Sequence, residues 1–104
     1  MLTIKTYYNK NMFILDADGH CGYNAHGKDI ICSAVSTLLY TFVISVQRIC
    51  DYNGDLNDSE DIFHYEVNLD KVNSDVFFII LKVLLCGLKI IEDDYSKYIK
   101  VIME

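Results

Sequence analysis

Within residues 19–36 the chain carries two histidines, two cysteines and an aspartate, all of which are side chains that can take part in chemistry. A cysteine beside a histidine can supply the nucleophile and the base of an acyl transfer. The same two residue types are also common protein ligands of zinc. The stretch is therefore a candidate for an active site or for a metal site, and the elements that hold it help to decide between the two.

The apolar run 30–46 contains no charged residue and predicts a buried helix from about 30 to 50. Asp29 stands where the N-cap of that helix should be, so Cys32 falls in its first turn. Backbone N–H groups in a first turn have no partner within the helix and favour a nearby negative charge, so we expect a stabilised Cys32 thiolate. A membrane span is the alternative, but the run is short for one and includes three serines and two threonines.

The loop before this helix carries His20 and has glycines at positions 19, 22 and 27. Glycine adopts backbone angles that other residues avoid, so the loop could fold back over the helix end and could order when a substrate binds. His20 would then lie beside Cys32 as its general base. The free N–H groups of the helix end could hold the oxyanion that forms when the thiolate attacks a peptide carbonyl.

Two neighbours of Cys32 are candidate supporting residues. Asp29 could orient His20, but a carboxylate so close would oppose thiolate formation, so we favour its role as the helix cap. Ser36 lies one turn after Cys32 on the same helix face, where it could hydrogen-bond near the thiol or bond back to its own helix.

The rest of the chain predicts an α+β fold in a single domain, residues 1–104. A second helix is expected from about 74 to 92, buried on most of its circumference, and Cys86 in it and Cys50 in the first helix are expected to pack in the core. Four strands are predicted, at 2–8, 12–18, 62–68 and 97–103. The expected architecture is a two-layer sandwich in the order β-β-α-β-α-β, with a mainly antiparallel four-stranded sheet and both helices on one face.

The amino-acid composition indicates which kinds of molecule this protein can bind and where it is expected to work. The 104 residues include fifteen acidic and nine basic ones, a net charge of −6, which argues against direct nucleic-acid binding and suits a basic partner. The acidic stretch 51–62 predicts a solvated loop, since Leu56 and Ile62 stand where a calcium loop needs glycine and glutamate. Four cysteines without an export signal predict a cytoplasmic protein with reduced thiols. Two very apolar helices in so short a chain suggest a homodimer.

Eight residues of the opening stretch form the spaced pattern G-H-x6-G-x-D-I-x-C-x-A-x-S, namely Gly19, His20, Gly27, Asp29, Ile30, Cys32, Ala34 and Ser36. This pattern resembles the ribosomal-processing cysteine proteases, the Prp family of small bacterial enzymes. The closing EDDYSKYIKVI is also similar to the ending of that family, so the resemblance covers nearly the whole chain.

The resemblance implies a cytoplasmic, homodimeric cysteine endopeptidase with Cys32 as nucleophile and His20 as general base. The family's substrate is a basic large-subunit ribosomal protein, number twenty-seven of the bacterial series. The enzyme removes its short N-terminal extension by cleavage after a phenylalanine during ribosome assembly. No cofactor and no membrane association are implied.

Two other functions remain open at this stage. His20, Cys21, His26 and Cys32 could bind zinc, although their spacing lacks the paired cysteines of structural sites and adjacent ligands would have difficulty reaching one ion. A non-catalytic acidic dimer that binds a basic ribosomal protein is the other alternative. It predicts binding that survives Cys32→Ala, without covalent chemistry.

Overall fold

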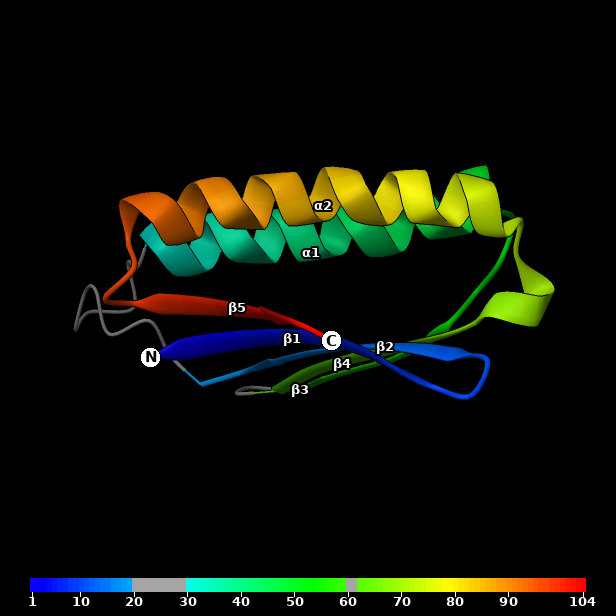
Figure 1. The fold of residues 1–104 in the computed structure, drawn as a ribbon, viewed down its shortest axis with the longest axis horizontal. Helices are drawn as coiled ribbons and strands as arrows, with labels where there is room; N and C mark the ends of the chain where they lie inside the picture. Colours follow the sequence, from blue (N-terminus) through cyan, green and yellow to red (C-terminus); the bar gives the residue numbers. More distant parts are fainter. Residues whose placement is uncertain (20–29, 60–61) are drawn as a thin grey trace.

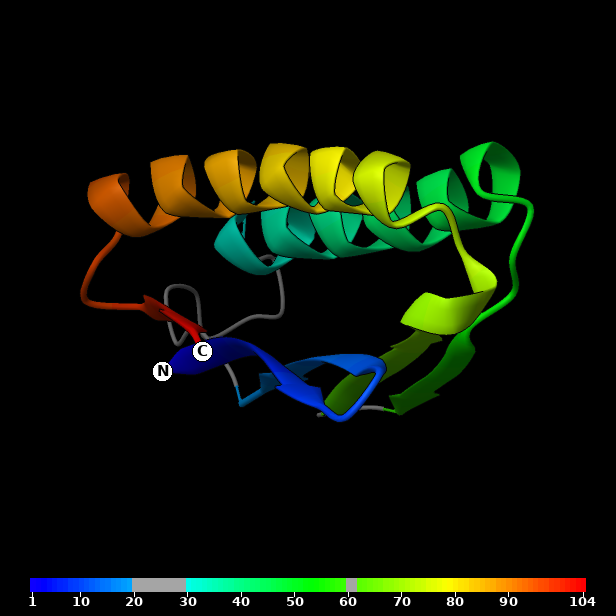
Figure 2. The ribbon, with the colours of Figure 1, turned by 45° about the vertical axis from the view of Figure 1, so that its right-hand side comes forward.

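A computed structural model describes residues 1–19, 30–59 and 62–104, in which two helices cover one face of a sheet (Figures 1 and 2). The helices α1 and α2 run antiparallel and side by side, as Figure 1 shows. The predicted α+β arrangement of two layers is confirmed. In chain order the elements are β1 (Leu2–Asn9), β2 (Met12–Asp18), α1 (Ile30–Ile49), β3 (Asp55–Ser59), β4 (Ile62–Asn68), the 3-10 helix η1 (Leu69–Lys71), α2 (Ser74–Asp94) and β5 (Ile99–Met103).

The sheet differs from the prediction in strand number and direction. It has five strands in the order β3-β4-β2-β1-β5, and it is mixed because β5 pairs parallel with β1 while the other pairs are antiparallel. The extra strand β3 lies within the stretch predicted to be a solvated loop. All five residues of β3 are exposed, and its Asp, Asn and Ser residues are poor strand formers. Pairing with β4 therefore stabilises this strand.

The core forms between the sheet and one face of each helix. Alternate side chains of β1, β2 and β4 point toward the helices and are buried, as expected for strands with one face covered. Three phenylalanines join the layers, because the ring centroid of Phe13 in β2 lies 6.0 Å from Phe42 and 5.1 Å from Phe77. On α1 the buried side chains recur with helical spacing: Ile31, Val35, Leu39, Phe42, Val43 and Val46.

Helix α2 is less buried than predicted. Its core face is limited to Phe77, Leu81, Leu84 and Leu88, because the sheet and α1 contact it from one side. Ile79, Val83 and Ile90 form an exposed apolar stripe, with 63%, 68% and 64% of their surfaces accessible. The prediction that Cys86 packs in the core is wrong, because Cys86 lies outside the core face of α2 and is exposed. Cys50 is partly buried and packs against the core.

Helix α1 is long and apolar enough to cross a membrane by length and composition alone. In the structure its apolar side chains pack against the sheet and α2, which is also how a core helix behaves. The finding is therefore weak evidence for a span. The predicted buried helix is buried along one face only, through Ile31, Val35, Leu39, Phe42, Val43 and Val46.

Candidate active site

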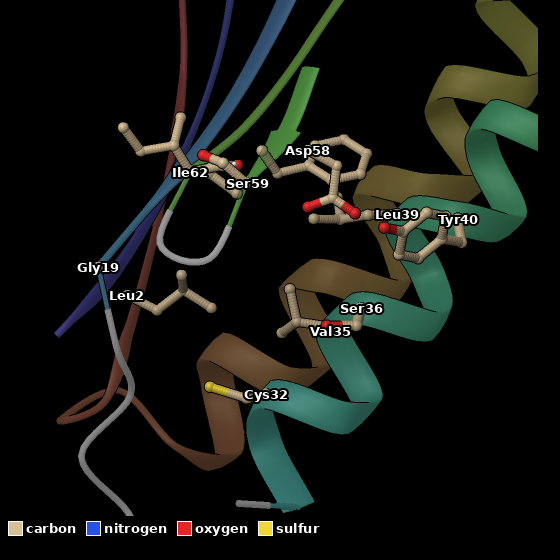
Figure 3. Close-up of a pocket in the computed structure, with 12 residues that line it drawn as sticks. Leu2, Gly19, Cys32, Val35, Ser36, Leu39, Tyr40, Asp58, Ser59 and Ile62 are labelled. Carbon is tan, nitrogen blue, oxygen red and sulfur yellow. Dashed lines mark hydrogen bonds between the residues drawn. The ribbon is translucent and has the colours of Figure 1, made fainter. Parts of the chain in front are cut away.

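Cys32 occupies the third residue of α1 and lines a pocket of about 260 Å³ between that helix and one end of the sheet. Figure 3 shows its Sγ pointing from the first helical turn into this pocket, with Leu2 and Gly19 across from it. The thiol is half-buried. The predicted placement of Cys32 in a helix first turn is confirmed, and the pocket gives a substrate a place beside the sulfur.

The start of α1 sets the electrostatics at the Cys32 end of the pocket. Within the described part of α1 the first turn contains no acidic residue. The backbone N–H groups of this turn carry the positive end of the helix dipole. A thiolate and a developing oxyanion are both stabilised by such groups, so one helix end can serve both steps of acyl transfer.

Gly19 forms part of the pocket wall at the point where the chain leaves β2. Its φ of +95° lies in the region that favours glycine, and a Cβ there would lie only 2.6 Å from the Met1 carbonyl oxygen. Glycine is thus required both by the backbone conformation and by the close approach of the N-terminal residue. Since His20 is the next residue in the sequence, the chain enters the segment of the predicted base directly from the pocket wall.

The other predicted site residues divide into two groups. Ser36 lies one turn beyond Cys32 and lines the same pocket. The remaining ones lie outside the described residues, as do three of the four candidate zinc ligands: His20, Gly27 and Asp29 of the active-site pattern, and His20, Cys21 and His26 of the zinc set. Over residues 1–19, 30–59 and 62–104 no group of side chains forms a metal site.

Sequence reasoning missed the far end of the pocket. Tyr40 follows Cys32 and Ser36 at steps of four residues, a spacing that places all three on one helix face and could have indicated it. Asp58 reaches the pocket from β3, and it was missed because that segment was predicted to be a loop. Apolar side chains complete the walls, among them Leu2, Val35, Leu39 and Ile62.

A second cluster of ionisable groups lies on the opposite face of the sheet, away from the helices. His64 contacts Asp16 through Nδ1, and its Nε2 lies 2.7 Å from Glu66 Oε2. The hydrogen bond to Glu66 raises the pKa of His64, against the effect of burial, and Asp16 adds to the rise. Tyr7 donates to Asp16 over 2.8 Å, so the cluster joins β1, β2 and β4. It does not reach the Cys32 pocket, and we assign it a role in stability.

Comparison with known proteins gives a consistent result over the whole chain. A family model described as cysteine protease Prp matches residues 1–100. The ribosomal processing cysteine protease Prp of Staphylococcus aureus strain Mu50 is 26% identical over 102 residues, covering 96% of both chains. Its counterpart in Bacillus subtilis strain 168 is 23% identical over 103 residues, covering 95% of this chain and 92% of the relative.

Solved structures share the fold. A crystal structure of the essential ribosomal processing protease Prp from S. aureus, in complex with a covalently linked product peptide, superposes with a TM-score of 0.83 at 25% identity, covering both chains fully. A second S. aureus structure, in complex with a substrate peptide, gives a TM-score of 0.79 at 23% identity, again over both full chains.

Proposed function

Because this chain belongs to the cysteine protease Prp family, we propose that it is a cysteine endopeptidase with Cys32 as its nucleophile and His20 as its general base. The observation that carries the proposal is the Cys32 thiol at the start of α1, directed into a pocket that is also lined by Gly19, the residue before His20 in the sequence. A buried packing cysteine would not need such an opening.

The reaction follows from these positions. The Cys32 thiolate attacks the scissile carbonyl carbon, and the positive end of the α1 dipole stabilises the resulting oxyanion. His20 accepts the thiol proton and gives it to the leaving amine as the peptide C–N bond breaks. Water, deprotonated by His20, then hydrolyses the thioester and restores the thiol. No metal or cofactor takes part in any of these steps.

The substrate that we propose is the N-terminal extension of ribosomal protein twenty-seven. Relatives named for ribosomal processing support this assignment, and one of them is solved with a substrate peptide. The mainly apolar pocket walls suit a phenylalanine before the scissile bond. The net charge of −6 suits a basic substrate, and we place the reaction in the cytoplasm, where thiols stay reduced.

We further propose that the protein is a homodimer that buries the exposed apolar stripe of α2. Ile79, Val83 and Ile90 recur along one side of that helix, and an apolar groove of about 310 Å³ lies beside them between α1 and α2. Light scattering should give twice the chain mass for the wild type and one chain mass for Val83→Lys. Lys82→Gln, an exposed neighbour off the stripe, should remain dimeric.

Mass spectrometry of one peptide tests the activity. The peptide spans the extension and the mature start of the host's ribosomal protein, and it is incubated with wild-type protein, Cys32→Ala and Cys86→Ala. We expect one cut after phenylalanine with the wild type and with Cys86→Ala, whose exposed thiol lies outside the pocket. Cys32→Ala should leave the peptide intact.

Two results would contradict the proposal. Cleavage that persists in Cys32→Ala would exclude this residue as the nucleophile. An intact peptide with every reduced and folded variant, together with tight binding of that peptide, would favour the non-catalytic binding module instead.

A further inference from the structure

Asp58 lies at the end of the pocket away from Cys32, next to Tyr40 of α1 (Figure 3). The register of the sheet explains why an edge-strand carboxylate reaches a pocket under the sheet. Asp58 pairs with Phe63 of β4, whose buried side chain faces the helices, and paired residues share a face. The Phe63 ring in turn packs edge-on against Tyr40 with centroids 5.6 Å apart. Asp58 therefore faces α1 across the pocket.

No cation among the described residues balances the carboxylate of Asp58. Across the parts of the chain that the structure describes, it takes part in no ion pair or hydrogen bond. The other walls of the pocket are apolar or neutral, so Asp58 supplies its one charge among the described lining residues. An unpaired carboxylate at the wall of a peptide site attracts lysine or arginine.

The rise of α1 between Cys32 and Tyr40 gives the approximate distance from the Cys32 sulfur to the Asp58 carboxylate. Tyr40 follows Cys32 by eight residues, which is about 12 Å along a helix axis at 1.5 Å per residue. An extended peptide covers about 3.3 Å per residue, so the same span corresponds to roughly three to four substrate residues.

From this geometry we infer that Asp58 is a specificity-determining residue, which selects peptides with a lysine or arginine three to four residues from the scissile bond. This inference rests on the proposed protease function and names the substrate class within it. Asp58 is remote from the reacting atoms, so it acts on peptide binding and alters KM, whereas kcat stays nearly constant.

Quenched fluorescent peptides test the inference. They share one scissile sequence and carry lysine, neutral norleucine or glutamate at each of four positions on either side of the cut. With wild-type protein, lysine at the third or fourth position of one side should raise kcat/KM about fivefold over norleucine, the upper range for an exposed ion pair. Higher salt should reduce this preference because the pair is exposed.

Three variants locate the source of the preference. Asp58→Asn should reduce it to less than twofold, through a change in KM for the lysine peptide. Asp58→Lys should reverse it in favour of glutamate. The matched control is Asp55→Asn, which removes the same charge from the same strand on the other face, since Asp55 pairs with the outward-facing Glu66. This control should keep the lysine preference.

Each outcome bears on a separate claim. A lysine preference that survives Asp58→Asn, or that falls equally in Asp55→Asn, would refute a local role of Asp58. Wild-type cleavage without any lysine preference would refute the inference and leave the protease function intact. If no peptide is cleaved, the protease function fails. Fluorescence anisotropy with Cys32→Ala then decides the inference alone, because the fivefold lysine preference must appear in Kd.

Discussion

The stability of this protein should fall as pH rises through the range in which His64 loses its proton. Ionised Asp16 and Glu66 only accept hydrogen bonds, so both ring nitrogens of His64 must carry hydrogen in the observed arrangement. The imidazolium is therefore the form that the fold stabilises. In agreement, the hydrogen bond to Glu66 foremost raises the pKa of His64 above its ordinary value of 6.5.

The magnitude follows from the number and exposure of these contacts. A hydrogen bond to a charged group contributes about 1.5–3 kcal/mol when buried. The side chains of His64, Asp16 and Glu66 are 30%, 31% and 35% exposed. Solvent therefore reduces each contact to about 0.5–1 kcal/mol, the upper part of the range of about 0.2–1 kcal/mol found for surface pairs. Together the two contacts add about 1–2 kcal/mol to the free energy of unfolding. This contribution is fully present below the pKa of His64 in the unfolded chain, near 6.5, and it is lost as pH rises through the higher pKa of His64 in the folded protein.

Urea unfolding of wild type, His64→Gln and Lys97→Gln between pH 5.5 and 9 measures this effect. The wild type should exceed His64→Gln by about 1–2 kcal/mol at pH 5.5, and the difference should shrink to below about 0.5 kcal/mol at the alkaline end. Lys97→Gln removes a positive charge from an exposed side chain outside the cluster and should keep the wild-type pH profile. A difference between wild type and His64→Gln that stays constant or grows with pH would show that neutral His64 is the stabilising form, and it would refute this reasoning.

Three further substitutions give separate tests. Gly19→Ala should lower the unfolding free energy by about 1–3 kcal/mol and reduce kcat/KM, because φ is +95° there and the residue lines the pocket; an unchanged melting curve would contradict this. Glu92→Gln should cost about 1 kcal/mol in urea unfolding, since its carboxylate accepts the Val101 N–H over 2.6 Å; equal stability would exclude that contact as a link between α2 and β5. Cys50→Ser should lower the melting temperature more than Cys86→Ser, because burial already raises the pKa of the Cys50 thiol whereas Cys86 is exposed; the reverse order would contradict the burial pattern.

The elements that the sequence predicts well are those whose local pattern agrees with their packing. Helix α1 begins at Ile30 as expected and ends within a residue of the expected limit, because its apolar run fills one face of the core. Strands β2 and β4 match their predicted bounds, since alternate residues of each are buried under the helices. The placement of Cys32 in a first turn followed directly from the start of the helix.

The rest depends on contacts between distant parts of the chain. Strand β3 has exposed, polar residues that carry no strand signal, and it exists through pairing with β4. Asp58 could not be assigned to the pocket without that register. Burial of α2 was overestimated because an apolar helix surface gives no sign of which side the sheet leaves uncovered.

The parallel pairing of β1 with β5 has a consequence for how the enzyme matures. Leu2 pairs with Ile99, so the first and last strands meet across nearly the full length of the chain. Contacts of such sequence separation form late and slowly in folding, and during synthesis they must wait until β5 has emerged. Because Leu2 also forms a wall of the Cys32 pocket, that wall is secured only when β5 has been synthesised and has paired with β1. Nascent, unfinished chains should therefore be inactive, which protects neighbouring proteins from a thiol nucleophile without a finished binding site.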